Sequence, residues 1–216
     1  MSKISKYKNQ SMVITNPPFG KRCSLAIEFL NKSLEIADIV CMILPMTFTR
    51  YSIQSKIQLD AKLIYSISIP ENSFLVNNRE YSVKCVFQIW TNKNVNLWLS
   101  NQRKVSNRLD INDLKLYIYN NTTDTIKYFD KEKYKWNFAV VRQGYYDYNE
   151  KITKPHELKS NRQYLFIKCK NKYIMDLIEE INFEELANKN TAVLGFSNSD
   201  LILEIYEKHI YKILKF

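Results

Sequence analysis

Residues 12–20 read Met-Val-Ile-Thr-Asn-Pro-Pro-Phe-Gly, and this stretch decides the fold class of the first part of the chain. Its first four residues are apolar or β-branched, which predicts a short buried strand. Pro17 and Pro18 end that strand, because proline donates no backbone hydrogen bond and fits neither a helix interior nor a strand ladder. The stretch therefore predicts a strand that stops at a rigid turn.

The residues that follow alternate between helix and strand patterns as far as residue 92. Apolar residues on one face predict a helix over 24–37 with Ser24 as its N-cap, and a second helix is expected over 51–61. Strands are predicted over 38–46, 63–69 and 82–91. This order indicates an α/β fold with a mostly parallel sheet, whose last strand can be reversed by the short loop before it.

The composition changes after Asn92, where the chain becomes polar and charged, and a boundary is expected between 92 and 108. We therefore divide the chain into an α/β domain over 1–92 and an α+β region over 93–216. In the second part, strands are expected at 114–119, 138–141 and 164–168, and helices at 172–187 and 199–214.

The chain of 216 residues is basic, with 32 Lys and Arg against 22 Asp and Glu, and 13% of its residues are aromatic. Nucleic acid suits such a composition, because phosphates attract cations and bases stack on rings. An AT-rich coding sequence is the other explanation, and charge alone does not choose between them. The 4 cysteines are widely spaced and only 2 histidines accompany them, so we expect free thiols and no metal site. The absence of a signal-peptide or membrane-helix pattern predicts a soluble, cytoplasmic protein without a membrane partner.

Asn16-Pro17-Pro18-Phe19 resembles the Asn/Asp-Pro-Pro-Tyr/Phe motif of methyltransferases that act on N6 of adenine in DNA. The segments that follow it also resemble, in order, the second half of that family's catalytic domain: Ile-Leu-Pro at 43–45, Ile-Pro-Glu-Asn-Ser-Phe at 69–74 and Val-Lys-Cys-Val-Phe-Gln-Ile-Trp at 83–90. The resemblance implies a partial class I, Rossmann-like methyltransferase sheet, S-adenosylmethionine as the methyl donor and DNA as a partner.

The resemblance also implies that Asn16, Pro17, Pro18 and Phe19 form the catalytic site. The Asn16 side-chain oxygen and the Pro17 carbonyl are two acceptors that can hold both hydrogens of an exocyclic amino group. The Phe19 ring offers a face on which a flipped-out base can stack. The alternative is that Asn-Pro-Pro is an ordinary tight turn without chemistry.

Four further residues are candidates for nucleic-acid binding. Lys21 and Arg22 follow the motif directly, and Arg142 and Tyr145 lie in a stretch that combines a cation, a glycine and aromatic rings. For Arg142 and Tyr145 the alternative is a solvated strand end. Related enzymes keep target-recognition elements in the region that corresponds to 93–216, so the resemblance implies that role for it.

The glycine turn that wraps S-adenosylmethionine in this family has no counterpart in the sequence. Gly144 and Gly195 stand alone, without a second glycine two positions away. We therefore name no cofactor-binding residue and expect weak binding of S-adenosylmethionine, or none, by the chain itself. We also expect a second chain, a homo-oligomer or the C-terminal region to cover the strand at 12–15.

Three interpretations stay open: one part of a split adenine methyltransferase, a truncated remnant of a longer enzyme, and a non-catalytic relative that binds nucleic acid or a partner. A protein-glutamine methyltransferase would use the same two acceptors on a side-chain amide. The basic charge favours DNA over that substrate.

Overall fold

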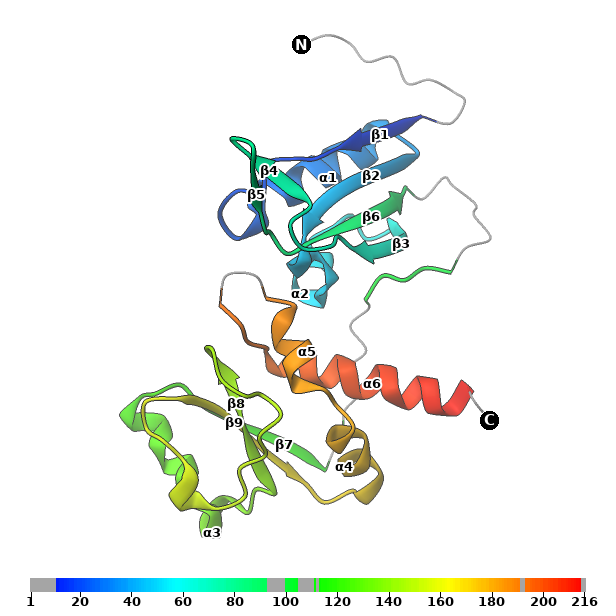
Figure 1. Ribbon diagram of the computed structural model, residues 1–216. Coiled ribbons are helices and arrows are strands. Elements are labelled where there is room, and N and C mark those ends of the chain that lie inside the picture. The colour runs from blue at the N-terminus through cyan, green and yellow to red at the C-terminus, as the bar shows by residue number, and fades with distance from the viewer. Residues whose placement is uncertain (1–10, 93–99, 105–110, 112, 191–192, 215–216) are drawn as a thin grey trace. The chain divides into compact units, whose positions relative to one another are not determined.

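The computed structural model describes residues 11–92, 100–104, 111, 113–190 and 193–214 (Figure 1). The chain forms two units, Met1–Val105 and Ser106–Phe216. The sequence predicted a boundary between 92 and 108 and assigned everything after Asn92 to the second part. The division instead falls after Val105, because residues 100–104 pack on the first unit.

A four-stranded sheet forms the first unit, with the strand order β1-β2-β6-β3. Its strands are β1 (Met12–Thr15), β2 (Ile39–Pro45), β3 (Lys62–Ser68) and β6 (Cys85–Thr91). β1 runs parallel to β2, whereas β6 is antiparallel to both β2 and β3. Strands β1, β2 and β3 therefore run in one direction, and β6, which runs in the opposite direction, lies between β2 and β3. This arrangement agrees with a mixed α/β class, but the prediction of a mostly parallel sheet is wrong, since β1 with β2 is the one parallel pair among the three strand pairs of this sheet. The predicted buried strand at 12–15 is instead an edge strand, with Met12 and Ile14 exposed.

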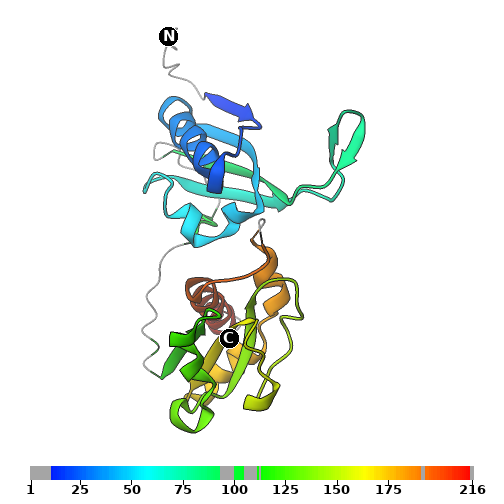
Figure 2. The same cartoon turned by 90° about the vertical axis from the view of Figure 1, so that its left-hand side faces the viewer.

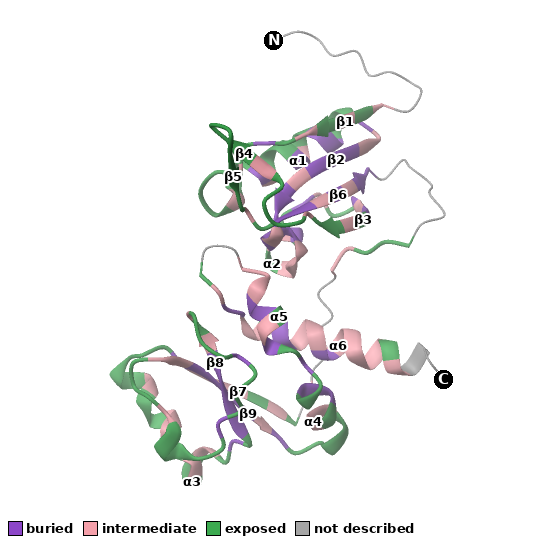
Figure 3. Ribbon diagram, viewed as in Figure 1, coloured by how far each residue is buried: buried purple, intermediate pink, exposed green. Residues whose placement is uncertain are grey.

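Helix α1 (Ser24–Ile36) covers one face of this sheet and buries its apolar side there (Figures 1 and 2). The buried strand residues of β2 and β6 line the interior, as the purple segments of Figure 3 show. The core on this face is made of the following side chains: Ala26, Leu30, Leu34, Val40, Met42, Leu44, Val86 and Trp90.

The start of α1 differs from the prediction, since Ser24 is the first helical residue and not the N-cap. The short 3-10 turn η1 (Lys21–Cys23) precedes α1. Cys23 is the N-cap of α1 and has a left-handed φ of 64°. No side chain caps the helix; the backbone carbonyl of Phe19 accepts a hydrogen bond from the Ala26 N–H at 3.3 Å. The turn after β1 thus supplies the acceptor that the sequence had assigned to a serine.

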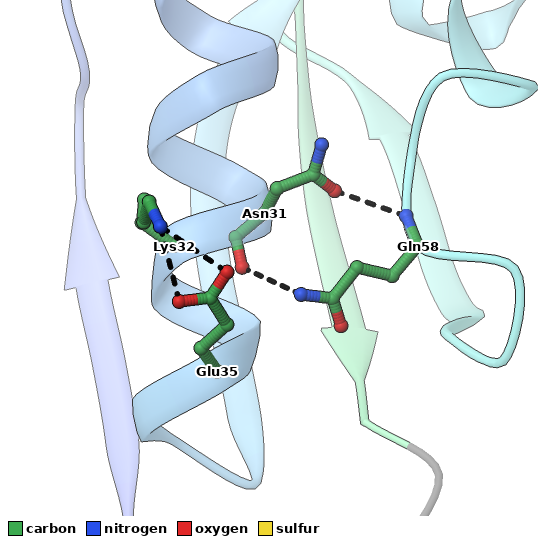
Figure 4. Close-up of polar contacts among 4 residues, drawn as sticks. All are labelled: Asn31, Lys32, Glu35 and Gln58. Atoms are coloured by element: carbon green, nitrogen blue, oxygen red, sulfur yellow. Dashed lines mark hydrogen bonds and ion pairs between the residues drawn. The ribbon is translucent and has the colours of Figure 1, made fainter.

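The helix expected over 51–61 is much shorter in the structure. A 3-10 turn, η2 (Met46–Thr49), leads into α2 (Tyr51–Gln54), and the chain after Gln54 is not helical. Side chains hold this irregular part. The Asn31 Oδ1 atom accepts a hydrogen bond from the Gln58 N–H at 3.0 Å, and Gln58 Nε2 donates to the Asn31 carbonyl at 2.9 Å (Figure 4).

The sequence analysis missed a β-hairpin between β3 and β6. Strand β4 (Phe74–Val76) pairs antiparallel with β5 (Arg79–Tyr81). The two turn residues, Asn77 and Asn78, have φ values of 51° and 60°. A two-residue hairpin turn of type I′ needs positive φ at both central positions, and asparagine tolerates that conformation better than most residues.

The second unit contains a three-stranded antiparallel sheet with the order β7-β9-β8. Its strands are β7 (Leu114–Tyr119), β8 (Phe138–Gln143) and β9 (Gln163–Cys169), at the three places predicted from the sequence. Between them lie η3 (Thr123–Phe129), α3 (Lys131–Tyr134) and η4 (Pro155–Glu157). The core of this unit is rich in aromatic side chains: Tyr119, Trp136, Phe138, Tyr148, Tyr164, Phe166, Phe183 and Phe196.

The helix predicted over 172–187 is interrupted. It consists of α4 (Lys172–Glu179) and α5 (Phe183–Asn188), because the Asn182 side chain accepts a hydrogen bond from the Glu185 N–H and starts a new helix. The last helix, α6 (Asn198–Leu214), follows a reciprocal pair in which Ser197 N–H donates to Asp200 Oδ2 and Asp200 N–H donates to Ser197 Oγ.

Candidate functional site

The Asn-Pro-Pro-Phe turn begins where β1 ends, at the carboxyl end of the parallel strands. Asn16 and Pro18 are exposed, Pro17 is buried and Phe19 is half-buried. None of the residues that the structure describes forms a hydrogen bond with the Asn16 side chain. The side chain of Asn16 is therefore exposed and without a hydrogen-bond partner among the described residues, and two prolines restrict the backbone that follows it.

Phe19 has a role in packing that the sequence analysis did not assign to it. Its ring lies against the apolar core of the first unit, and its carbonyl binds the start of α1. Gly20 has a φ of 68°, and a Cβ atom there would lie 2.7 Å from Leu25 Cγ. The turn thus needs glycine at this position, and only the solvent-facing part of the Phe19 ring remains for a ligand.

The segments that follow β1 and β2 meet at the same edge of the sheet. Cys23 Sγ and Thr47 Oγ1 lie 3.2 Å apart, which links the start of α1 to η2. The Met46 N–H donates to the Lys84 carbonyl at 2.9 Å, which joins the end of β2 to the residue before β6. In open α/β sheets ligands bind outside the carboxyl ends of strands, and we call this edge, with the turn at 16–19, the motif edge.

A buried glutamine fixes the geometry behind the motif edge. Gln88 is fully buried on β6, and its Nε2 donates to Ser66 Oγ at 3.2 Å and to the Phe48 carbonyl at 3.4 Å. The Trp90 indole N–H donates to Gln88 Oε1 at 3.0 Å. A buried amide with its donors and acceptor satisfied rigidifies the surrounding chain. This role of Gln88 was not predicted, because the residue occurs within an apolar strand.

The first unit carries most of the net positive charge of the chain. Residues 1–105 contain 14 Lys and Arg against 6 Asp and Glu, so this unit accounts for a net charge of +8 out of +10. On the segments that extend from the motif edge, five cations stand against Glu71 and Glu80. These cations are Lys21, Arg22, Arg50, Arg79 and Lys84. The motif edge thus combines an uncharged acceptor pair with surrounding positive charge, which suits an anionic polymer.

The four residues predicted to bind nucleic acid fall in different units. Lys21 and Arg22 are exposed on η1, next to the motif. Arg142 and Tyr145 belong to the second unit. Arg142 is half-buried, and its Nη1 donates a hydrogen bond to Asn120 Oδ1 at 2.9 Å. Burial lowers the pKa of the Arg142 guanidinium, and the Asp200 carboxylate opposes that shift. Tyr145 is 77% exposed. Arg142 therefore has a structural partner, whereas Tyr145 presents its ring to solvent.

Within the described ranges, no group of three or more His, Cys, Asp or Glu side chains is arranged to hold a metal ion. No helix in the same part of the chain has the length and apolar character needed to cross a membrane.

No protein-family model, curated protein or solved structure matches this chain.

Proposed function

We propose that this chain is the substrate-holding part of an S-adenosylmethionine-dependent DNA adenine-N6 methyltransferase. The single observation that carries the proposal is the exposed side chain of Asn16, which immediately precedes Pro17 at the carboxyl end of β1, the edge strand that pairs parallel with β2. The resemblance implied a partial class I sheet, and the reversed β6 between β2 and β3 is compatible with it, although the connection before β6 contains the β4–β5 hairpin and is not the short loop that the sequence predicted.

The acceptor pair activates the adenine amino nitrogen without a titrating base. The lone pair of the adenine amino nitrogen is delocalised into the ring, so that nitrogen is a poor nucleophile. Two fixed acceptors, Asn16 Oδ1 and the Pro17 carbonyl, accept the two amino hydrogens and favour the tetrahedral geometry that frees the lone pair. Pro17 and Pro18 keep both acceptors in place, so that little reorganisation is needed when the base arrives.

The residues present do not fit S-adenosylmethionine. The cofactor's family site needs a glycine turn at the end of a strand, and Gly20, Gly144 and Gly195 are isolated. Gly20 has a different use, since its positive φ and close approach to Leu25 serve the motif turn itself. In this proposal the methyl donor and the loop that holds it are supplied by a second polypeptide or by a further part of a longer enzyme.

Strand β1 offers a surface for that polypeptide. In the described part of the chain β1 pairs only with β2, so its other edge has backbone groups without a neighbouring strand. Met12 and Ile14 point to the same side of the sheet and are 54% and 73% exposed. Unpaired strand edges with exposed apolar side chains favour strand addition.

The second candidate function is a module that binds nucleic acid or a partner without chemistry, and the missing glycine turn favours it. Methyl transfer separates the two. The chain is isolated from its native cells together with its bound partners. Transfer of labelled methyl groups from S-adenosylmethionine to duplex DNA is then measured for wild type, Asn16→Ala and Asn161→Ala. Asn161 is an exposed asparagine of the second unit and serves as the matched control.

We expect Asn16→Ala to lower the rate by about 10²–10³, as the loss of one oriented polar group in a preorganised site does. Asn161→Ala should leave the rate unchanged, and the melting temperatures of all three proteins should agree. A fully active Asn16→Ala protein, or the absence of methyl transfer from every preparation, overturns the catalytic proposal. Low-micromolar binding of S-adenosylmethionine to the purified chain alone, measured by calorimetry, overturns the assignment of the cofactor site to residues outside this sequence.

A further inference from the structure

The β4–β5 hairpin projects from the motif edge. It connects the carboxyl end of β3 to the start of the reversed β6, and both of these points lie at the edge where β1 and β2 end. Figure 2 shows the hairpin, in green-cyan at the right, standing away from the four-stranded sheet. The hairpin is thus an arm on the same side of the first unit as Asn16.

The hairpin contributes little to the core of the first unit. Residues 75–82 are all exposed, and Leu75, Val76 and Tyr81 expose 72%, 51% and 56% of their surface. A two-stranded hairpin is at best marginally stable in water without packing against other elements. Exposed apolar side chains on such an arm mark a surface that contacts another molecule.

The chemistry of the arm fits the major groove of duplex DNA. That groove is about 12 Å wide and admits a two-stranded β-ribbon. The tip presents the amides of Asn77 and Asn78 and the guanidinium of Arg79, which are side chains that read adenine and guanine edges. Leu75 and Val76 can contact thymine methyl groups.

Charge favours DNA over an apolar protein surface as the occupant, and the fit of a two-stranded ribbon to the major groove favours DNA over an acidic protein surface. Lys21, Arg22 and Arg50 lie on the other segments of the motif edge, and Lys84 lies at the base of the arm. Cations placed around a groove-binding ribbon hold the phosphates and set its register, while the ribbon itself contacts the bases. The two acidic residues of the arm, Glu71 and Glu80, are outnumbered on this edge.

We propose that the β4–β5 hairpin enters the major groove beside the target adenine and selects the DNA sequence. The inference rests on the proposed function, because it takes duplex DNA to be the substrate that Asn16 contacts. It assigns sequence selection to an arm of the first unit, whereas the family resemblance implied target recognition in residues 93–216.

The test removes the amides at the tip while keeping the turn. Glycine adopts positive φ readily, so the double variant Asn77→Gly, Asn78→Gly preserves the hairpin backbone. Asn121→Gly is the matched control, since Asn121 also has a positive φ of 60° and lies in the second unit. The full-length proteins select duplexes from a randomised library, and their affinities for selected and scrambled duplexes are compared at one salt concentration.

We expect wild type and Asn121→Gly to enrich the same sequence. The double variant should lose at least about tenfold of the preference for the selected duplex and bind scrambled duplex nearly as before, because base contacts carry selectivity and phosphate contacts do not. An unchanged preference in the double variant, an equal loss on both duplexes, or a wild type that enriches no sequence overturns the inference. Methyl transfer that depends on Asn16 persists in each of these cases if the proposed function holds, so the two failures are distinguishable.

Discussion

Replacement of Arg103 by alanine tests how the first unit is held together beyond its sheet. The Arg103 guanidinium donates hydrogen bonds to five backbone carbonyls of the irregular chain after α2. These carbonyls belong to Gln54, Ile57, Gln58, Leu59 and Ala61. The Gln102 N–H donates to the Leu63 carbonyl at 2.7 Å, so the segment 100–104 is also tied to β3. Arg103 thus replaces the backbone amides that would satisfy these carbonyls in a continued helix.

The size of the effect follows from the solvent exposure of these groups. Arg103 is half-buried, and burial lowers the pKa of its guanidinium, with Asp60 and Tyr51 acting in the opposite direction. In the alanine variant, water can replace the guanidinium at the exposed Leu59 carbonyl, whereas the others are partly buried and lose more. A hydrogen bond to a charged group contributes about 1.5–3 kcal/mol, and such values do not add. We expect a loss of about 3 kcal/mol, which corresponds to roughly 12–24 °C for a unit of this size.

Hydrogen exchange measures the effect in each unit separately. Protection of the β6 amides should fall in Arg103→Ala, while protection of the β9 amides in the second unit stays at the wild-type value. Arg103→Lys keeps the charge but not the planar fork, so it should be intermediate. Arg79→Ala, an exposed arginine on the hairpin, should stay within about 0.5 kcal/mol of wild type. If the β6 protection in Arg103→Ala also stays within that range, the carbonyl cluster does not stabilise the unit.

Two further predictions concern the cysteines. Alkylation of the native protein should modify Cys23 first, because Cys41, Cys85 and Cys169 are buried and Cys23 is not. The labelled positions are mapped by mass spectrometry, and early labelling of any of the three buried cysteines would contradict the packing. Burial raises the pKa of the Cys85 thiol from 9.0 to about 11, so the fold keeps a proton that the unfolded chain releases above about pH 9. The resulting contribution, at most about 2–3 kcal/mol, is complete below that pH and is lost as the pH rises toward 11. Urea midpoints measured near about pH 8 and about pH 10.5 should therefore fall more for wild type than for Cys85→Ala, and equal falls would argue against a buried neutral thiol.

Local patterns predicted most of the regular elements. The apolar runs at 38–46 and 63–69 became β2 and β3, and the weak pattern at 114–119 became β7 over the same residues. Strand periodicity is a property of neighbouring residues, so it can be recognised without knowledge of distant contacts. The same holds for the motif turn, whose two prolines stop β1 wherever that strand lies in the fold.

One of the elements that the sequence analysis misplaced depends on a contact between residues far apart in the chain, and the other two depend on a local side-chain hydrogen bond and on a weak turn signal. The helix expected over 51–61 ends at Gln54, where Arg103 binds the carbonyls that a helix would have used. The helix expected over 172–187 is divided at Asn182, whose side chain competes for a backbone amide. The hairpin had a local signal in Asn77-Asn78, and it was missed because asparagine pairs are weaker turn markers than Asn-Gly.

The sequence by itself determined the nature of the candidate site, because an amide and a proline carbonyl next to each other in the chain stay next to each other in any fold. Only the tertiary structure decided what surrounds that pair. It brought Thr47 of η2 to within 3.2 Å of Cys23 and packed one side of Phe19 against the core. It also placed the buried Gln88 behind the motif edge and left β1 with one paired side among the described residues. Strand order and burial depend on how the whole unit packs its apolar surface, and this packing is not recorded in any short stretch of residues.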